Sequence, residues 1–173
     1  MTVPEVMEEV EKDRLFFEQS GGGVTFSGGE PVLQHQFLSA LLKACRSVGI
    51  HTAVETAGNV PTDHLLEIIP ETDLFLYDIK GMDDARHVQT TGVGNRRILG
   101  NLALLSEKGA RIRIRVPVIP GVNDTTESMT ALADLIRNLP GIEQVELIPF
   151  HKMATEKNES LGLVYEAEHI PML

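Results

Sequence analysis

The chain has 173 residues, of which 42% are hydrophobic and 23% are charged, a size and composition that suit one folded domain with a single core. Its 15 glycines and 9 prolines are too few for a collagen-like or low-complexity protein. Because 25 acidic residues outnumber 15 basic ones and give a net charge of −10, the chain is not expected to bind nucleic acid or an anionic membrane non-specifically. We therefore expect one domain over residues 1–173.

The N-terminal segment MTVPEVMEEVEKDRLFF is acidic where a secretory signal would be basic and then apolar, and no run approaches the ~18 apolar residues of a membrane span. These features predict a cytoplasmic protein. Cys45 is the only cysteine, so the chain cannot form an internal disulfide or, alone, a cluster or zinc site built on cysteines.

Short apolar runs alternate with segments of helical periodicity along the chain, a pattern typical of β/α folds with parallel strands. The N-terminal helix is expected within 1–20, starting from a capping box of Thr2 and Glu5, and a β/α core is expected over 24–150, followed by a C-terminal segment 151–173. Within the core we predict helices at 33–48, 61–69, 95–108 and 125–138, and strands at 24–26, 50–54, 74–79, 111–116 and 145–148.

The strand at 111–116 reads RIRIRV, so its three arginines share one face and its isoleucines the other. Parallel strands buried on both faces usually read as continuous apolar runs. The arginine face therefore lines either solvent or a polar interior that can hold an anion.

Polar or glycine-rich residues follow each predicted strand, where parallel β/α folds place their functional loops. Each one alone has an ordinary explanation as a turn, a helix cap or a surface residue. Together they predict a rim that holds a small zwitterionic ligand; they are SGGEP at 27–31, ETAG at 55–58, Asp78 and Lys80, Arg115 with the turn at 120–121, and PFH at 149–151.

The pair Gly28 and Gly29 would let a ligand approach the backbone closely. The SGG triplet also occurs in transporter ATPases, but the chain has no G-x4-G-K-[ST] phosphate loop, and no G-x-G-x-x-G follows a strand. A nucleotide-phosphate site and a dinucleotide fold are thus not supported.

Six motifs, in order, resemble those of the radical S-adenosylmethionine (SAM) enzymes, and within them the activating enzymes of glycyl-radical enzymes, of the pyruvate formate-lyase-activating type. These motifs are GGGVTFSGGEP at 21–31, HTAVETAG at 51–58, YDIK at 77–80, H-x3-T-G-x2-N at 87–95, I-R-x4-P-G-x-N-D at 114–124 and LIPFH at 147–151. The resemblance covers essentially the whole chain. It implies a partial (β/α) barrel of about five parallel strands, truncated relative to the family's barrel.

The resemblance also implies roles for individual residues. Gly28, Gly29 and Glu30 would hold the amino group of SAM, while Asp78 and Lys80 would lie near its carboxylate and the incoming glycyl peptide. Arg115 would belong to the same inner rim, which favours a polar interior for that arginine.

Two further sites are implied. His151 would lie beside the ribose and the substrate. Glu55, Thr56 and Asp78 match a monovalent cation site, although the family has Asp at the position of Glu55.

The family's C-x3-C-x2-C loop, which binds a [4Fe–4S] cluster, is absent from these 173 residues. We therefore expect this chain to be part of an activating enzyme, inactive alone, whose full-length parent carries the cluster, receives electrons from a flavodoxin or ferredoxin, and acts on a glycyl-radical enzyme.

Two alternatives belong to other classes. One is a cluster-free β/α protein that binds SAM or a partner without radical chemistry. The other is a metal-dependent lyase on a similar barrel, for which no paired-histidine motif is evident. The expected fold has a further consequence: without the family's first strand, the strand at 24–26 becomes an exposed edge, which favours dimerisation or low solubility.

Overall fold

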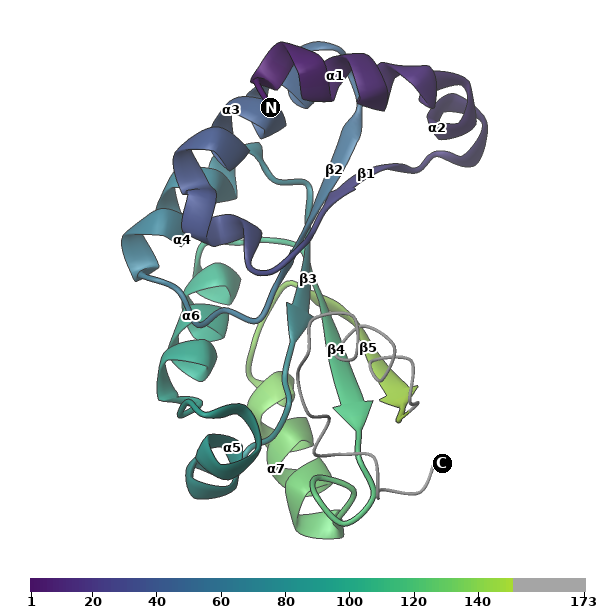
Figure 1. Ribbon diagram of the computed structural model, residues 1–173. Coiled ribbons are helices and arrows are strands. Elements are labelled where there is room, and N and C mark those ends of the chain that lie inside the picture. Colours follow the sequence, from purple (N-terminus) through teal and green to yellow (C-terminus); the bar gives the residue numbers. More distant parts are fainter. Residues whose placement is uncertain (151–173) are drawn as a thin grey trace, which may run out of the picture.

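A computed structural model describes residues 1–150 of the protein (Figure 1). The chain alternates helices and strands in the order α1 (Val3–Lys12), α2 (Arg14–Ser20), β1 (Gly23–Phe26), η1 (Pro31–Gln34), α3 (His35–Ser47), β2 (His51–Thr56), α4 (Thr62–Ile68), η2 (Ile69–Glu71), β3 (Leu74–Asp78), α5 (Asp84–Thr91), α6 (Arg96–Glu107), β4 (Ile112–Val118), α7 (Thr126–Arg137) and β5 (Ile142–Pro149).

The five strands form one parallel sheet in the order β1-β2-β3-β4-β5, so each β/α unit adds its strand beside the previous one. Figure 1 shows α3, α4, α6 and α7 along one side of this curved sheet. Parallel neighbours joined by helices on one side are the arrangement of an open barrel. The predicted α/β class and partial barrel of five parallel strands are confirmed.

The core lies between the sheet and these helices. In β3, Phe75 and Tyr77 are fully buried, as are Ile112 and Ile114 in β4, because alternate residues of a strand face the helices. A second, smaller cluster joins Val10 of α1 to residues of α3 and β1. The opposite face of the sheet is therefore left for polar side chains.

Several elements differ from the sequence-based expectation. The N-terminal helix is interrupted at Asp13, and β5 begins at Ile142 rather than at 145. The helix α5 was not predicted, because residues 84–91 carry little apolar periodicity. Two capping residues mark the ends of this helix and could have indicated it from the sequence. Asp83 at its start accepts a hydrogen bond from the Arg86 amide, and Gly92 at its end has a left-handed conformation.

Strand β1 lies at one edge of the sheet and pairs only with β2 in the part of the chain that the structure describes. The exposed edge predicted for the strand at 24–26 is thus present. Among the described helices, none has the length and apolar character needed to cross a membrane.

Candidate functional site

The glycine turn that follows β1 leaves open space around its backbone. Gly28 has a φ of +132°, a conformation that residues with a side chain rarely adopt, and a Cβ on Gly28 or Gly29 would meet no atom within 4 Å. Both glycines are exposed. A ligand can therefore reach the main-chain groups of this turn, as the sequence suggested.

Glu30 fixes the turn to the end of the neighbouring strand. Its carboxylate accepts hydrogen bonds from the Thr56 hydroxyl at 2.9 Å, the Ala57 amide at 3.0 Å and the Val32 amide at 3.3 Å. Thr56 is itself buried, and its hydroxyl oxygen accepts a bond from the Gly58 amide at 2.9 Å. Both side chains thus have a structural role in joining the loops after β1 and β2.

An arginine and two carboxylates from three neighbouring strands form a cluster on the face of the sheet away from the helices. Nη2 of Arg115 in β4 lies 2.6 Å from Oε1 of Glu55 in β2 and 2.7 Å from Oδ1 of Asp78 in β3. Nε of Arg115 also donates to Asp78 Oδ1 at 2.9 Å. The sheet register, which sets Asp78 opposite Arg115, brings these residues together.

Burial alone would lower the pKa of the Arg115 guanidinium, but its hydrogen bonds to Glu55 and Asp78 outweigh that effect, so the pKa is raised. The cluster therefore holds a permanent positive charge between two carboxylates.

Arg113 and Arg115 in β4, and Arg111 directly before it, differ in their exposure to solvent. The side-chain exposure falls from 57% at Arg111 to 41% at Arg113 and 19% at Arg115, toward the carboxyl end of the strand. Arg111 pairs with Glu143 at 2.5 Å. The polar-interior interpretation therefore applies to Arg115, whereas Arg111 lies in solvent.

Lys80 is exposed just beyond β3, and its backbone is held by a buried asparagine. Asn123 donates to the carbonyl oxygens of Lys80 at 3.0 Å and Pro117 at 2.7 Å, and it accepts a bond from the Ile119 amide at 2.7 Å. One side chain thus joins the loops after β3 and β4.

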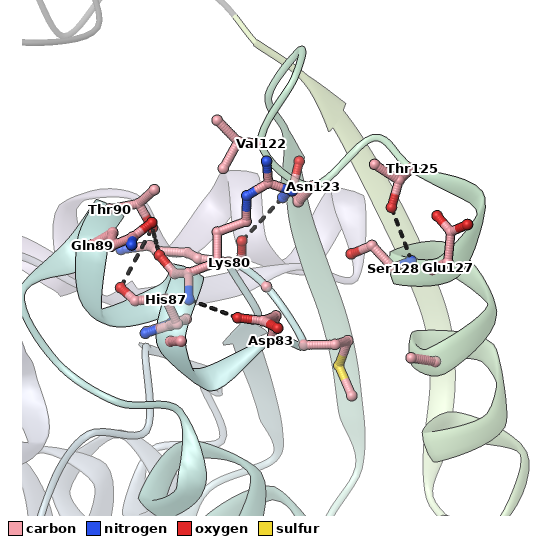
Figure 2. A pocket seen from close by; sticks show the side chains of 15 residues that line it. Lys80, Asp83, His87, Gln89, Thr90, Val122, Asn123, Thr125, Glu127 and Ser128 are labelled. Atoms are coloured by element: carbon pink, nitrogen blue, oxygen red, sulfur yellow. Dashed lines mark hydrogen bonds between the residues drawn. The ribbon is translucent and has the colours of Figure 1, made fainter.

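A cavity of about 600 Å³ opens beside Lys80, between α5 and the start of α7 (Figure 2). Its lining includes Asp83 and Arg86 of the α5 region and Glu127 and Ser128 of α7. Arg86 bridges it to the loop after β4 by donating to the Gly121 carbonyl at 2.9 Å. The predicted site did not include these four residues: α5 was not predicted, and the residues of α7 do not follow a strand end, where the site was expected.

A family model described as "Radical SAM superfamily" matches residues 1–134. The chain is 41% identical over 175 residues to the choline trimethylamine-lyase activating enzyme of Oleidesulfovibrio alaskensis, covering 99% of this chain and 56% of that protein. It is 39% identical to the pyruvate formate-lyase-activating enzyme of Clostridium pasteurianum, covering 98% of this chain and 71% of that protein. The chain belongs to the radical SAM superfamily, in the family of glycyl-radical-enzyme activating enzymes.

A solved structure supports the same assignment. A domain of a pyruvate-formate lyase-activating enzyme from Bacteroides vulgatus superposes with a TM-score of 0.71 at 32% identity, covering 82% of this chain and 96% of that one. This radical SAM chain spans little more than half the length of the first curated relative it matches.

The family's cluster ligands have no counterpart in this radical SAM chain. Cys45 is fully buried in α3, its Sγ lies 3.6 Å from the sulfur of Met7, and burial raises the pKa of its thiol. Within residues 1–150, no group of three or more His, Cys, Asp or Glu side chains is placed to hold a metal ion. Cys45 is a packing residue, in agreement with its helical spacing.

The remaining expected site residue, His151, and the C-terminal segment 151–173 lie outside the described residues. The roles inferred from the resemblance for the rim residues stay predictions.

Proposed function

We propose that this chain forms the SAM-binding part of an activating enzyme that generates a glycyl radical on a partner enzyme. The observation that supports the proposal best is the set of polar groups at the carboxyl ends of the strands. The open glycine turn after β1 is fixed by Glu30 to the end of β2, and the neighbouring strands carry the cluster of Glu55, Asp78 and Arg115. Family membership supplies the reaction class.

The rim residues fit SAM in charge and in space. The two carboxylates and one guanidinium of the cluster sum to one negative charge, which suits a ligand with a sulfonium and an ammonium group. Gly28 and Gly29 leave room for the methionyl amino group to approach their backbone, and Lys80 offers a positive charge to its carboxylate.

Bound SAM, together with a reducing cluster, would supply the radical chemistry that removes a glycine hydrogen from the partner; that chemistry belongs to the cofactors. We assign to this chain the binding and orientation of SAM by Gly28, Gly29 and Glu30, and the positioning of SAM and the glycyl peptide by Asp78, Lys80 and Arg115. His151 is proposed to lie beside the ribose.

The residues present do not fit the [4Fe–4S] cluster, because the single cysteine is buried and three thiolates are needed. We therefore assign the cluster to a longer parent protein and expect this chain to be inactive by itself. A flavodoxin or ferredoxin as electron donor, a pyruvate formate-lyase-like partner, edge-mediated dimerisation and a cytoplasmic setting belong to the same proposal.

The lone buried cysteine also supports a second candidate, a cluster-free protein that binds SAM or a partner without radical chemistry. The two candidates differ in the coding sequence upstream of residue 1. A C-x3-C-x2-C motif in the same reading frame supports an activating enzyme, whereas its absence supports the second candidate.

Calorimetric titration of the chain with SAM tests the rim. We expect Gly29→Val to abolish binding, because its side chain would fill the space through which the ligand approaches the backbone, whereas its Cβ would meet no protein atom within 4 Å. Gly100→Val is the matched control, since a Cβ on Gly100 also meets nothing within 4 Å and α6 lies away from the rim.

The control is expected to bind SAM like the wild type. Equal affinities of the wild type and Gly29→Val would contradict the assignment of the glycine turn. Absence of SAM binding to the folded wild-type chain would contradict the proposed function, because the chain would then not assemble the SAM site.

A further inference from the structure

The cluster of Glu55, Asp78 and Arg115 occupies the position of a metal cation site suggested by the resemblance. That site would use Glu55, Thr56 and Asp78. Whether these residues fit a monovalent cation depends on the hydrogen bonds and ion pairs that their side chains already make.

The side chain of Thr56 does not join the other two. Successive residues of a strand point to opposite faces, so Thr56 lies on the helix side while Glu55 lies on the rim side. Thr56 is 2% exposed, and its hydroxyl is bonded to Glu30 and to the Gly58 amide. This hydroxyl is therefore engaged elsewhere.

The two carboxylates already share a positive charge. Nη2 of Arg115 donates a hydrogen bond to Oδ1 of Asp78 at 2.7 Å and forms an ion pair with Oε1 of Glu55 at 2.6 Å, so one guanidinium nitrogen contacts both carboxylates. A guanidinium stays charged at any working pH, and here its pKa is raised further.

We propose that Arg115 replaces the metal ion: its guanidinium supplies the positive charge between Glu55 and Asp78, and this rim needs no monovalent metal cation at that place. A metal ion would have to separate the guanidinium from both carboxylates and leave the Arg115 side chain, which is 19% exposed, without those partners. Removing the partners of a largely buried charge is strongly unfavourable, so the ion pair excludes the metal.

The decisive measurement is the melting temperature of the chain in LiCl, NaCl, KCl and choline chloride at equal ionic strength. Choline is too large to enter a metal site and controls for ionic screening. The wild-type melting temperature is expected to be the same in all four salts. A saturable rise with Na⁺ or K⁺ in the wild type would overturn the proposal.

Arg115→Gln removes the charge and leaves the two carboxylates facing each other. This variant should melt at a lower temperature in choline chloride and recover saturably in NaCl or KCl, by about 2–4 °C or more for a chain of this size. Arg113→Gln is the matched control, because it makes the same change two residues away on the same strand face, and its melting temperature should not depend on the cation.

A folded Arg115→Gln without any cation response would also overturn the proposal, since Arg115 would then not stand in for a metal ion. If Arg115→Gln is unfolded in every salt, the wild-type series decides: a cation-independent melting temperature supports the proposal and a saturable rise overturns it.

The inference builds on the proposed function only in its second readout, the affinity for SAM. That affinity should be unaffected by K⁺ in the wild type and restored by K⁺ in Arg115→Gln. If the wild type binds no SAM, the proposed function fails while the melting series still decides the role of Arg115.

Discussion

At the scale of residues, single polar side chains hold the loops of the rim at fixed positions. Glu30 and Asn123 each make three hydrogen bonds, of which two from Glu30 and one from Asn123 reach a loop that is distant in sequence. Tyr77 is buried in β3 and donates to the Ile98 carbonyl at 2.6 Å, while burial and the nearby charge of Glu30 raise the pKa of its hydroxyl. The hydroxyl therefore stays protonated and keeps its bond.

Gly58 is a residue where both conformation and space require glycine. Its φ is +70°, and a Cβ would overlap the Tyr77 hydroxyl. We predict that Gly58→Ala lowers the free energy of unfolding by at least about 2 kcal/mol more than Gly49→Ala does, because overpacking adds to the strain of the left-handed backbone.

Gly49 is the matched control, since its φ is +74° and a Cβ there would meet nothing within 4 Å. Urea denaturation of the two variants measures the difference. Equal losses in the two variants would show that the Tyr77 contact is not rigid.

At the scale of elements, the edge strand β1 combines two features that promote association. Its outer backbone groups are unpaired within the described sheet, and α2, which directly precedes it, exposes 69% of both Leu15 and Phe16. Unpaired strand edges and exposed apolar side chains both favour contact with another chain.

We predict that the wild-type chain forms dimers or larger species as its concentration rises, and that Thr25→Lys in β1 reduces this association because a charge on an edge strand opposes pairing. Light scattering coupled to gel filtration measures the mean mass. Thr130→Lys, an equivalent change on the exposed side of α7, should associate like the wild type. A wild type that stays monomeric at high concentration would refute the prediction.

At the scale of the whole molecule, two hydrophobic clusters of unequal size stabilise the part of the fold formed by residues 1–150. The larger lies between the sheet and α3, α4, α6 and α7, whereas the smaller joins α1 to Cys45 and Ile50. Because the smaller cluster buries fewer side chains, the N-terminal helices should open locally at a lower free energy than the sheet.

Amide hydrogen exchange in two variants tests whether the N-terminal helices open at a lower free energy than the sheet. Val10→Ala in the smaller cluster should speed exchange in α1 and leave β3 unchanged. Leu102→Ala, at a fully buried position of the larger cluster, should speed exchange throughout and cost about 2–5 kcal/mol. If Val10→Ala sped exchange in β3 as much as in α1, the two clusters would form one cooperative unit.

The sequence by itself determined the order of the β/α units, because apolar spacing of two residues in strands and of 3.6 in helices depends on neighbours along the chain. It also indicated the open turn at Gly28 and Gly29, the edge position of β1, the packing role of Cys45 and the polar strand ends. It missed α5, where capping residues rather than apolar periodicity mark the helix.

Only the tertiary structure decided how the polar side chains pair. Sequence alternation placed three arginines on one face, but the pairing of β2, β3 and β4 encloses Arg115 alone, between Glu55 and Asp78. The same packing turned Thr56 toward Glu30. Such contacts join residues 26 to 60 positions apart, and their geometry depends on strand register and distance, which no local pattern contains.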